Sequence, residues 1–303
     1  MTMQLAHLGG PVLAPVQLGP IFAVALLYAM RVRALAMTPR AVPGWRQACF
    51  FGGLTLIVLT LASPIGHVAE ELFWVHMTEH LLIADIGALM LVLGTTGPLL
   101  APVLRVRWLA WLRVLSHPLV ALPLWALDFY AWHLPALYQA AVRYPAVHAL
   151  EHFAFVSFGA AMWMALLGPL PKPPWFGNAA RLLYIVAVRL IGSVLANVIL
   201  WDDKVLYRDY RPGERYWGIS AHSDQVVAGS VMMVEGSIVT ICLFCWLFLR
   251  AAREGEERQE LLDYAASRGV ELEDRRAARA VAAGRGADLR KRIGRDSPDA
   301  GEG

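Results

Sequence analysis

The chain contains the pattern His-x-x-Glu-His twice, at residues 76–80 and at residues 148–152. In an α-helix, residues i and i+4 lie about 40° apart around the axis, so the two imidazoles of each motif share one face. Imidazole binds copper, zinc and iron, and a carboxylate either ligates the ion or holds an imidazole in place. The pattern therefore predicts a transition-metal site. Its candidate ligands are His76, His80, His148 and His152, with Glu79 and Glu151 as ligands or supporting groups.

Other residues could complete such a site. His133 closes one apolar segment, and His222 and Asp224 open another. Met232 follows Asp224 by eight residues, roughly 80° around a helix, so both can face one interior site, and its thioether favours Cu(I). Asp128, five residues before His133, is a candidate supporting group. We add His133 to the expected ligands and treat the other four as possible ligands or supporting residues.

The elements that must position these residues are membrane spans. The chain has 303 residues, of which 57% are hydrophobic and only 17% charged, against about 25% charged in soluble domains. Seven stretches reach the roughly 17–25 apolar residues that cross a bilayer, and only helices satisfy the backbone there. We expect an all-α polytopic bundle of about seven helices, at residues 18–37, 46–63, 71–97, 116–135, 144–168, 181–201 and 224–249.

Short-loop arginines and lysines predict the orientation, because they concentrate on the cytoplasmic side. They are dense in the first, third and fifth connections and sparse in the second and fourth. The sixth connection mixes basic and acidic residues and fits less well. We expect the N-terminus outside and the C-terminus in the cytoplasm, which places every histidine except His117 on the outer side, His7 and His67 included.

Residues 1–250 are predicted to form the transmembrane domain and residues 251–303 a charged cytoplasmic tail, partly helical or disordered. The net charge of +3 is small, and no basic stripe is interleaved with aromatic residues, so nucleic acid is not an expected partner. Three cysteines exclude a disulfide framework. Cys242 and Cys245 lie in an apolar helix, and we interpret them as packed apolar cysteines.

Three charged residues fall near the middle of predicted spans, where an unpaired charge costs about 2.5–3.5 kcal/mol on insertion scales. They are Asp85, Arg189 and Glu235. We expect them to be paired or hydrogen-bonded in a buried polar network, and we interpret this network as ion pairs that fix helix packing. The alternative is a gate or proton path below the metal site.

Five ordered motifs resemble the polytopic caa3-type cytochrome c oxidase assembly factors called CtaG, over residues 18–250. The motifs are His76-Met77-x-Glu79-His80-Leu81-Leu82 with Leu93-Gly94-x-x-Gly97-Pro98, Ser116-His117-Pro118, Trp132-His133-Leu134-Pro135-x-Leu137-Tyr138, Val147-His148-x-Leu150-Glu151-His152, and Asp224-Gln225-x-x-Ala228-Gly229-x-x-Met232. The family often has Gln at the position of Glu79 and an aromatic residue at that of Met233.

This resemblance implies a multi-pass protein of the inner (plasma) membrane that supports assembly of a haem-copper oxidase. Copper is the expected cargo, an oxidase subunit the expected partner, and the protein itself is not an enzyme. Three alternatives stay open. His-x-x-Glu-His is also a zinc metallohydrolase signature with Glu as general base. One histidine from each of two helices could hold a b-type haem. A copper transporter would need a continuous polar path.

Overall fold

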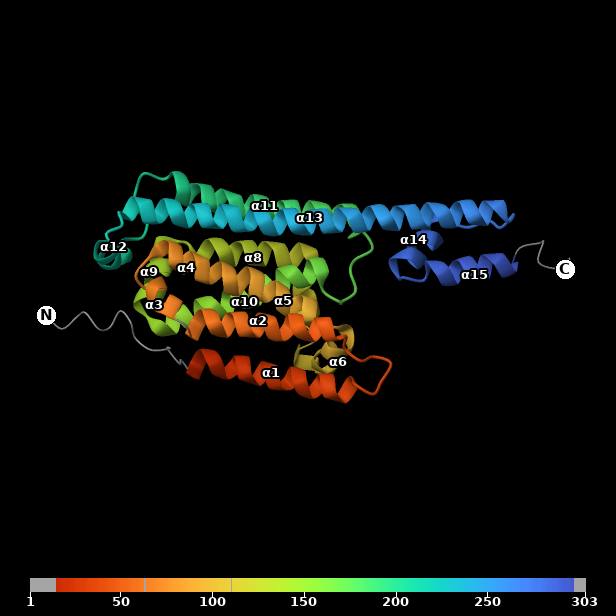
Figure 1. Ribbon diagram of the computed structural model, residues 1–303, viewed down its shortest axis with the longest axis horizontal. Helices are drawn as coiled ribbons and strands as arrows, with labels where there is room; N and C mark the ends of the chain where they lie inside the picture. The colour runs from red at the N-terminus through yellow and green to blue at the C-terminus, as the bar shows by residue number, and fades with distance from the viewer. Residues whose placement is uncertain (1–14, 63, 110, 297–303) are drawn as a thin grey trace. The chain divides into compact units, whose positions relative to one another are not determined.

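A computed structural model of the protein describes residues 15–62, 64–109 and 111–296 (Figure 1). The regular structure of these residues is helical throughout, which confirms the all-α prediction. The helices are α1 Pro15–Leu35, α2 Gly44–Ala62, α3 Pro64–Ala69, α4 Phe73–His80, η2 Leu81–Gly87, α5 Ala88–Gly94, α6 Gly97–Arg105, η3 Arg107–Leu109, α7 Leu112–Leu115, α8 Pro118–Trp132, α9 Pro135–Arg143, α10 Pro145–Leu167, α11 Asn178–Trp201, η4 Arg208–Tyr210, α12 Arg211–Trp217, α13 Ala221–Ser267, α14 Asp274–Ala282 and α15 Gly286–Asp296.

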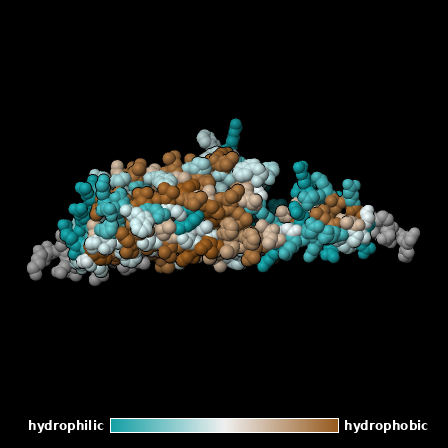
Figure 2. Space-filling model, turned by 90° about the horizontal axis from the view of Figure 1, so that it is seen from above, coloured by the Kyte–Doolittle hydropathy of each residue, from teal (hydrophilic) through white to brown (hydrophobic). Residues whose placement is uncertain are grey.

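Six of the described helices are long and apolar enough to cross a membrane, and a seventh span is possible if α7 and α8 with their preceding turn count as one bent span. Large apolar side chains such as Phe22, Leu127 and Leu190 lie exposed on their surfaces, each more than 60% accessible. On the face shown in Figure 2, hydrophobic residues cover the central part of the bundle. Exposed apolar surface of this extent is expected where lipid, rather than water, surrounds the protein.

The fourth predicted span, residues 116–135, is the shortest in the structure. Its continuous part, α8, has 15 residues, or about 22 Å of helix, against about 30 Å of hydrocarbon. Pro118 begins the helix, where its missing N–H is not needed. A bend of 82° separates α8 from residues 107–115. At its other end α8 stops at His133, and Pro135 begins the short helix α9.

One continuous element, α4–η2–α5, runs through the centre of the bundle and packs against α2 and α10. Its middle part, η2, is a π-helix, a rare form whose hydrogen bonds join residues five apart and which is common at functional sites. Glycines permit the close packing around it. Gly87 faces Ile57 of α2, and Gly159 of α10 lies against the backbone carbonyl of Ala84 in η2.

We expect Gly159→Ala to destabilise the protein by about 1–3 kcal/mol, the usual penalty for overpacking a core. A Cβ at this position would overlap the Ala84 carbonyl oxygen, which is backbone and cannot rotate away. Thermal unfolding in detergent measures the effect. The matched control is Gly19→Ala in α1, where a Cβ meets open space and alanine is the better helix former. Equal melting temperatures for the two variants would contradict the tight contact.

The chain divides into two compact units, Met1–Phe176 with Leu183–Thr240, and Gly177–Leu182 with Ile241–Gly303. The second unit contains the end of α13 together with α14 and α15. These helices share a small apolar core of Leu261, Ala265, Val281, Leu289 and Ile293. The sequence predicts a charged tail, partly helical or disordered, and it does not reveal this core because the apolar residues are dispersed over three helices rather than gathered in one run.

Two helices of this second unit end at glycines with positive φ. Gly269 and Gly284 follow α13 and α14 with φ of 65° and 66°, the left-handed conformation that commonly ends a helix.

Cys242 and Cys245 are free thiols with exposed side chains on α13. Our interpretation of them as packed cysteines is therefore wrong within this chain. Both side chains lie on an exposed face of α13, and the sequence of one helix does not show which of its faces packs against other helices.

Candidate metal centre

The structure brings the two His-x-x-Glu-His motifs into contact. The first motif lies in α4 and the second in α10, and both helices begin at the same end of the bundle, which we call the histidine end (Figure 1). The rings of His76 and His148 are stacked, with centroids 5.1 Å apart and planes inclined by 15°. The rings of His80 and His152, one helical turn further along, have centroids 5.2 Å apart. Four imidazoles thus gather between two spans.

The two glutamates cross between the helices. Glu151 of α10 lies 3.7 Å from the Nε2 atom of His80 in α4, and Glu79 of α4 lies 4.0 Å from the Nε2 atom of His152 in α10. Each motif therefore supplies the carboxylate that faces the other motif's second histidine. Together the six residues form what we call the histidine cluster: His76, Glu79, His80, His148, Glu151 and His152.

The cluster is buried except for His148, which is half-buried, and its polar atoms are poorly satisfied. Glu151 is 0% and His76 1% exposed. Both ring nitrogens of His76, His80 and His152 and both carboxylate oxygens of Glu151 are buried without a hydrogen-bond partner. Buried polar groups are nearly always paired, because an unpaired one costs about 1–3 kcal/mol. A set of unpaired lone pairs at one point is the arrangement that a cation would satisfy.

The spacing of these atoms suits an ion. Ligand atoms of His76, His80, His148 and Glu151 lie within 4.8 Å of one another, and a second such group contains Glu79, His148 and His152. Ligands bonded at about 2.0–2.1 Å stand about 3.3 Å apart in a tetrahedral site and about 4.1 Å apart when opposite each other. The cluster residues therefore fit a transition metal after shifts of about 1 Å.

His133 lies beside the cluster but outside both groups. It caps the C-terminus of α8, and its Nδ1 atom is 2.7 Å from the carbonyl oxygen of Phe129. A carbonyl can only accept, so Nδ1 carries the proton and Nε2 is left with a free lone pair. That Nε2 atom is buried without a partner. Phe155 lies near both His80 and His133, with ring centroids 4.8 and 6.0 Å away.

Asp224 supports the cluster rather than entering it. Its two carboxylate oxygens accept hydrogen bonds from the backbone N–H groups of Phe73 and Trp74, at 2.8 and 2.9 Å. These amides are at the start of α4 and have no partner within the helix. The carboxylate, which is 0% exposed, also complements the positive end of the helix dipole. Asp224 of α13 thus fixes the helix that carries His76 and His80.

An aromatic cover over the cluster was not predicted from the sequence. Tyr138 and Tyr210 share a hydrogen bond of 2.8 Å, and their rings lie 5.2 and 6.0 Å from that of His76. Tyr207 donates to the carbonyl of His133 at 2.7 Å. Burial raises the pKa of Tyr207 and Tyr210 above its usual value, so both hydroxyls stay neutral. Tyr138 belongs to a motif noted above. Tyr207 and Tyr210 lie in the sixth connection, whose mixed charges give no signal for an aromatic contact with the histidines.

The remaining candidates lie in different places. Met232 is buried near the cluster, in the same apolar core as Met77. Asp128 accepts a hydrogen bond from the indole of Trp132 at 3.0 Å, on its own helix. His222 is exposed and is not part of the cluster. His7 lies outside the described residues.

The predicted polar network is only partly formed. Asp85, Arg189 and Glu235 line one interior cavity of about 60 Å³. Arg189, however, donates to the Ser237 hydroxyl at 2.7 Å and to the Met233 carbonyl at 3.2 Å, and no ion pair with either carboxylate is present in the described part of the chain. The expected ion pairs are replaced by hydrogen bonds to the neighbouring turn of α13.

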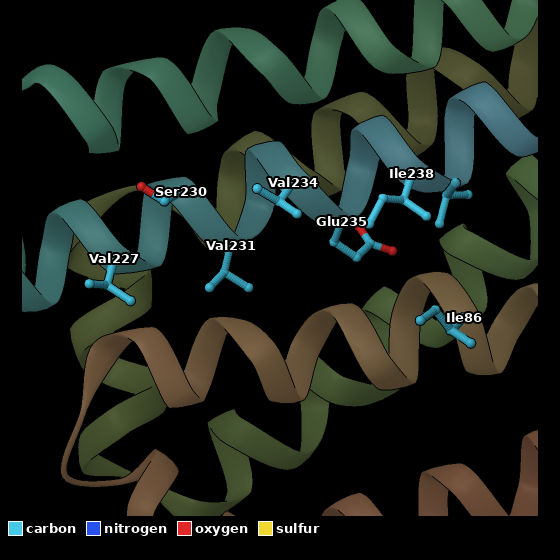
Figure 3. A pocket seen from close by; sticks show the side chains of 8 residues that line it. Ile86, Val227, Ser230, Val231, Val234, Glu235 and Ile238 are labelled. Carbon is cyan, nitrogen blue, oxygen red and sulfur yellow. The ribbon is translucent and has the colours of Figure 1, made fainter.

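Glu235 is the most unusual member of this set. Figure 3 shows its carboxylate directed from α13 toward the helix that carries Ile86. There it borders an apolar groove of about 440 Å³, lined mostly by valine and isoleucine side chains. One of its oxygens is buried without a hydrogen-bond partner. An acidic group in such surroundings is costly and is usually retained for a function.

The fold and the cluster define a class of protein: a polytopic helical membrane protein that gathers four imidazoles and two carboxylates between two of its spans. The chain belongs to the family described as cytochrome c oxidase caa3 assembly factor (Caa3_CtaG), which it matches over residues 26–254. The match contains the whole histidine cluster, His133, Asp224 and Met232. It confirms the resemblance noted in the sequence.

Relatives of this chain occur in mycobacteria. The chain is 26% identical over 265 residues to uncharacterized proteins of Mycobacterium bovis and Mycobacterium tuberculosis, and 24% identical over 229 residues to one of Mycobacterium leprae. These alignments cover 80% and 70% of this chain but only 40% and 35% of the relatives. The chain thus spans less than half the length of the curated relatives it matches. No solved structure matches it.

Proposed function

We propose that this protein binds copper at the histidine cluster and supports its delivery to a haem-copper oxidase in the plasma membrane, as a non-catalytic assembly factor. One observation carries the proposal: most of the imidazole and carboxylate atoms that converge between α4 and α10 are buried without a hydrogen-bond partner. Membership of the caa3 oxidase assembly family supports the choice of recipient.

The chemistry of the donors favours copper over other metals. Imidazole serves zinc, copper, iron and nickel alike, but thioether sulfur selects Cu(I). Met77 lies within the first motif and is 1% exposed, and Met232 is 6% exposed in the same apolar core. A carrier also needs a route for exchange. The cluster lies at the histidine end of the bundle, where short helices and loops, rather than further spans, adjoin it.

The arrangement of the glutamates argues against a zinc hydrolase. Such an enzyme uses one His-x-x-Glu-His motif, a distant third ligand and an open position for water, with the glutamate as base. Here each glutamate lies against a histidine of the opposite motif, at 3.7 and 4.0 Å, and two motifs merge into one cluster. These positions support a role for both carboxylates as ligands or ligand supports.

The experiment uses a host that makes a caa3-type oxidase and lacks its own copy of this gene. Complementation with this protein is expected to restore the copper content and activity of the oxidase, while the His222→Ala variant, changed at an exposed histidine, restores both equally. The purified protein is expected to contain copper. Zinc alone in the purified protein, or a haem absorption band, would support the hydrolase or haem alternatives instead and overturn this proposal.

A further inference from the structure

The π-helix η2 changes which residues lie below the cluster. It begins directly after His80, and Asp85 is five residues further along. In an α-helix Asp85 would point about 140° away from His80. In a π-helix, whose hydrogen bonds join residues five apart, such residues come to the same side of the axis. The carboxylate of Asp85 therefore lies on the same side of the helix as the cluster, one turn deeper in the bundle.

A small cavity of about 50 Å³ occupies this position. Its lining combines soft sulfur, imidazole and carboxylate with an aromatic wall. The residues are Met77, His80, Asp85, His133, Met232, Phe129, Phe155, Trp125, Leu81 and Ala84. The Nε2 atom of His133 and one oxygen of Asp85 are buried without hydrogen-bond partners. On this measure one water molecule needs roughly 10–15 Å³, so the space is adequate for a cation.

We propose that this cavity is a second, deeper copper(I) position, with the thioethers of Met77 and Met232 and the Nε2 atom of His133 as ligands and Asp85 as counter-charge. The inference rests on the proposed function, because the ion reaches the cavity through the histidine cluster. His80 belongs to both places, and both of its nitrogens are unpartnered. It therefore links the cluster to the cavity.

The donor set determines which ion the deeper position accepts. Two thioethers and one imidazole select Cu(I), whereas zinc prefers imidazole, thiolate and carboxylate. One negative charge at Asp85 balances one positive charge, and a monovalent ion in the bilayer interior then leaves no net charge. His133 and Asp85 do not join the groups of atoms within 4.8 Å that the described residues form. The nitrogen and oxygen donors of the deeper position are thus set further apart than those of the cluster.

The test is X-ray absorption and metal analysis of the purified protein loaded with Cu(I) under reducing conditions. We expect about two copper ions per chain and sulfur among the nearest neighbours of copper. The Met77→Leu/Met232→Leu variant is expected to keep about one copper ion, bound by nitrogen and oxygen only. Leucine for methionine nearly conserves volume and is tolerated in cores, so the variant should fold. Zinc loading is expected to give about one ion per chain in both proteins.

Met233→Leu is the matched control, because the Met233 sulfur contacts Arg189 and Asn197 and does not line this cavity. It should keep both copper ions and the sulfur signal. One copper ion without sulfur in the wild-type protein would overturn the deeper position and leave the cluster intact. Sulfur that persists in the double variant would overturn the ligand assignment. A wild-type protein that binds no copper would overturn both this inference and the proposed function.

Discussion

The His76→Ala/His80→Ala double variant is expected to lose its copper, with an affinity at least about 100-fold below that of the wild-type protein. Loss of a group that only supports a ligand typically costs 10–100-fold, and this variant lacks two of the proposed ligands. His76, His80, His148 and Glu151 form the larger of the two close-set groups, so the change removes half of its donors. Copper content after purification and competition with a Cu(I) chelator measure the loss.

Two further variants separate ligand loss from misfolding. Glu151→Gln keeps the size of a side chain that is 0% exposed but replaces a charged oxygen donor, and we expect a 10–100-fold weaker site in a protein of unchanged melting temperature. His222→Ala alters an exposed histidine and should leave copper binding unchanged. Full copper retention by the double variant would show that the cluster is not the binding site.

Asp224→Ala is expected to lower the free energy of unfolding by about 2–4 kcal/mol. Two backbone N–H groups, the buried one of Phe73 and the partly buried one of Trp74, lose the carboxylate that accepts from them, and loss of a buried acceptor costs about 1–3 kcal/mol. The start of α4 also loses the negative charge that complements the helix dipole. Because α4 carries His76 and His80, copper affinity should fall as well, although Asp224 touches no ligand.

Thermal unfolding in detergent and chelator competition check this second expectation on the same samples. Asp224→Asn keeps one carbonyl oxygen as acceptor and should fall between the wild-type protein and the alanine variant. A ligand role for Asp224 predicts a different pattern, in which copper affinity falls while the stability of the metal-free protein does not. That pattern would contradict the capping role.

The spans and the pairing of histidines could be predicted from sequence because each depends on local periodicity. Apolar length identifies a span, and i, i+4 spacing places His76 with His80 whatever surrounds them. The role of Asp224 could not be predicted this way. A carboxylate near histidines suggests a ligand, and only the fold shows that its oxygens reach backbone amides 150 residues away in the chain.

Two other features lie beyond local pattern for different reasons. The π-helix at Leu81–Gly87 has no composition of its own, and it depends on packing against α2 and α10, where Gly87 and Gly159 make room. The sequence predicts an ion pair between Arg189 and a carboxylate, because an unpaired charge in lipid is costly. In the structure, the Arg189 guanidinium donates instead to the Ser237 hydroxyl and the Met233 carbonyl. These acceptors are uncharged, so a search of the sequence for opposite charges does not find them.

The crossed placement of Glu79 and Glu151 has a mechanical consequence. Each carboxylate lies opposite a histidine of the other helix, so neither α4 nor α10 alone supplies a complete histidine–carboxylate pair. Moving α4 and α10 apart lengthens both cross-helix pairs together, so the distance between these two helices would set how tightly the proposed ion is held. A partner protein that separates α4 from α10 would therefore open the whole proposed site in a single movement.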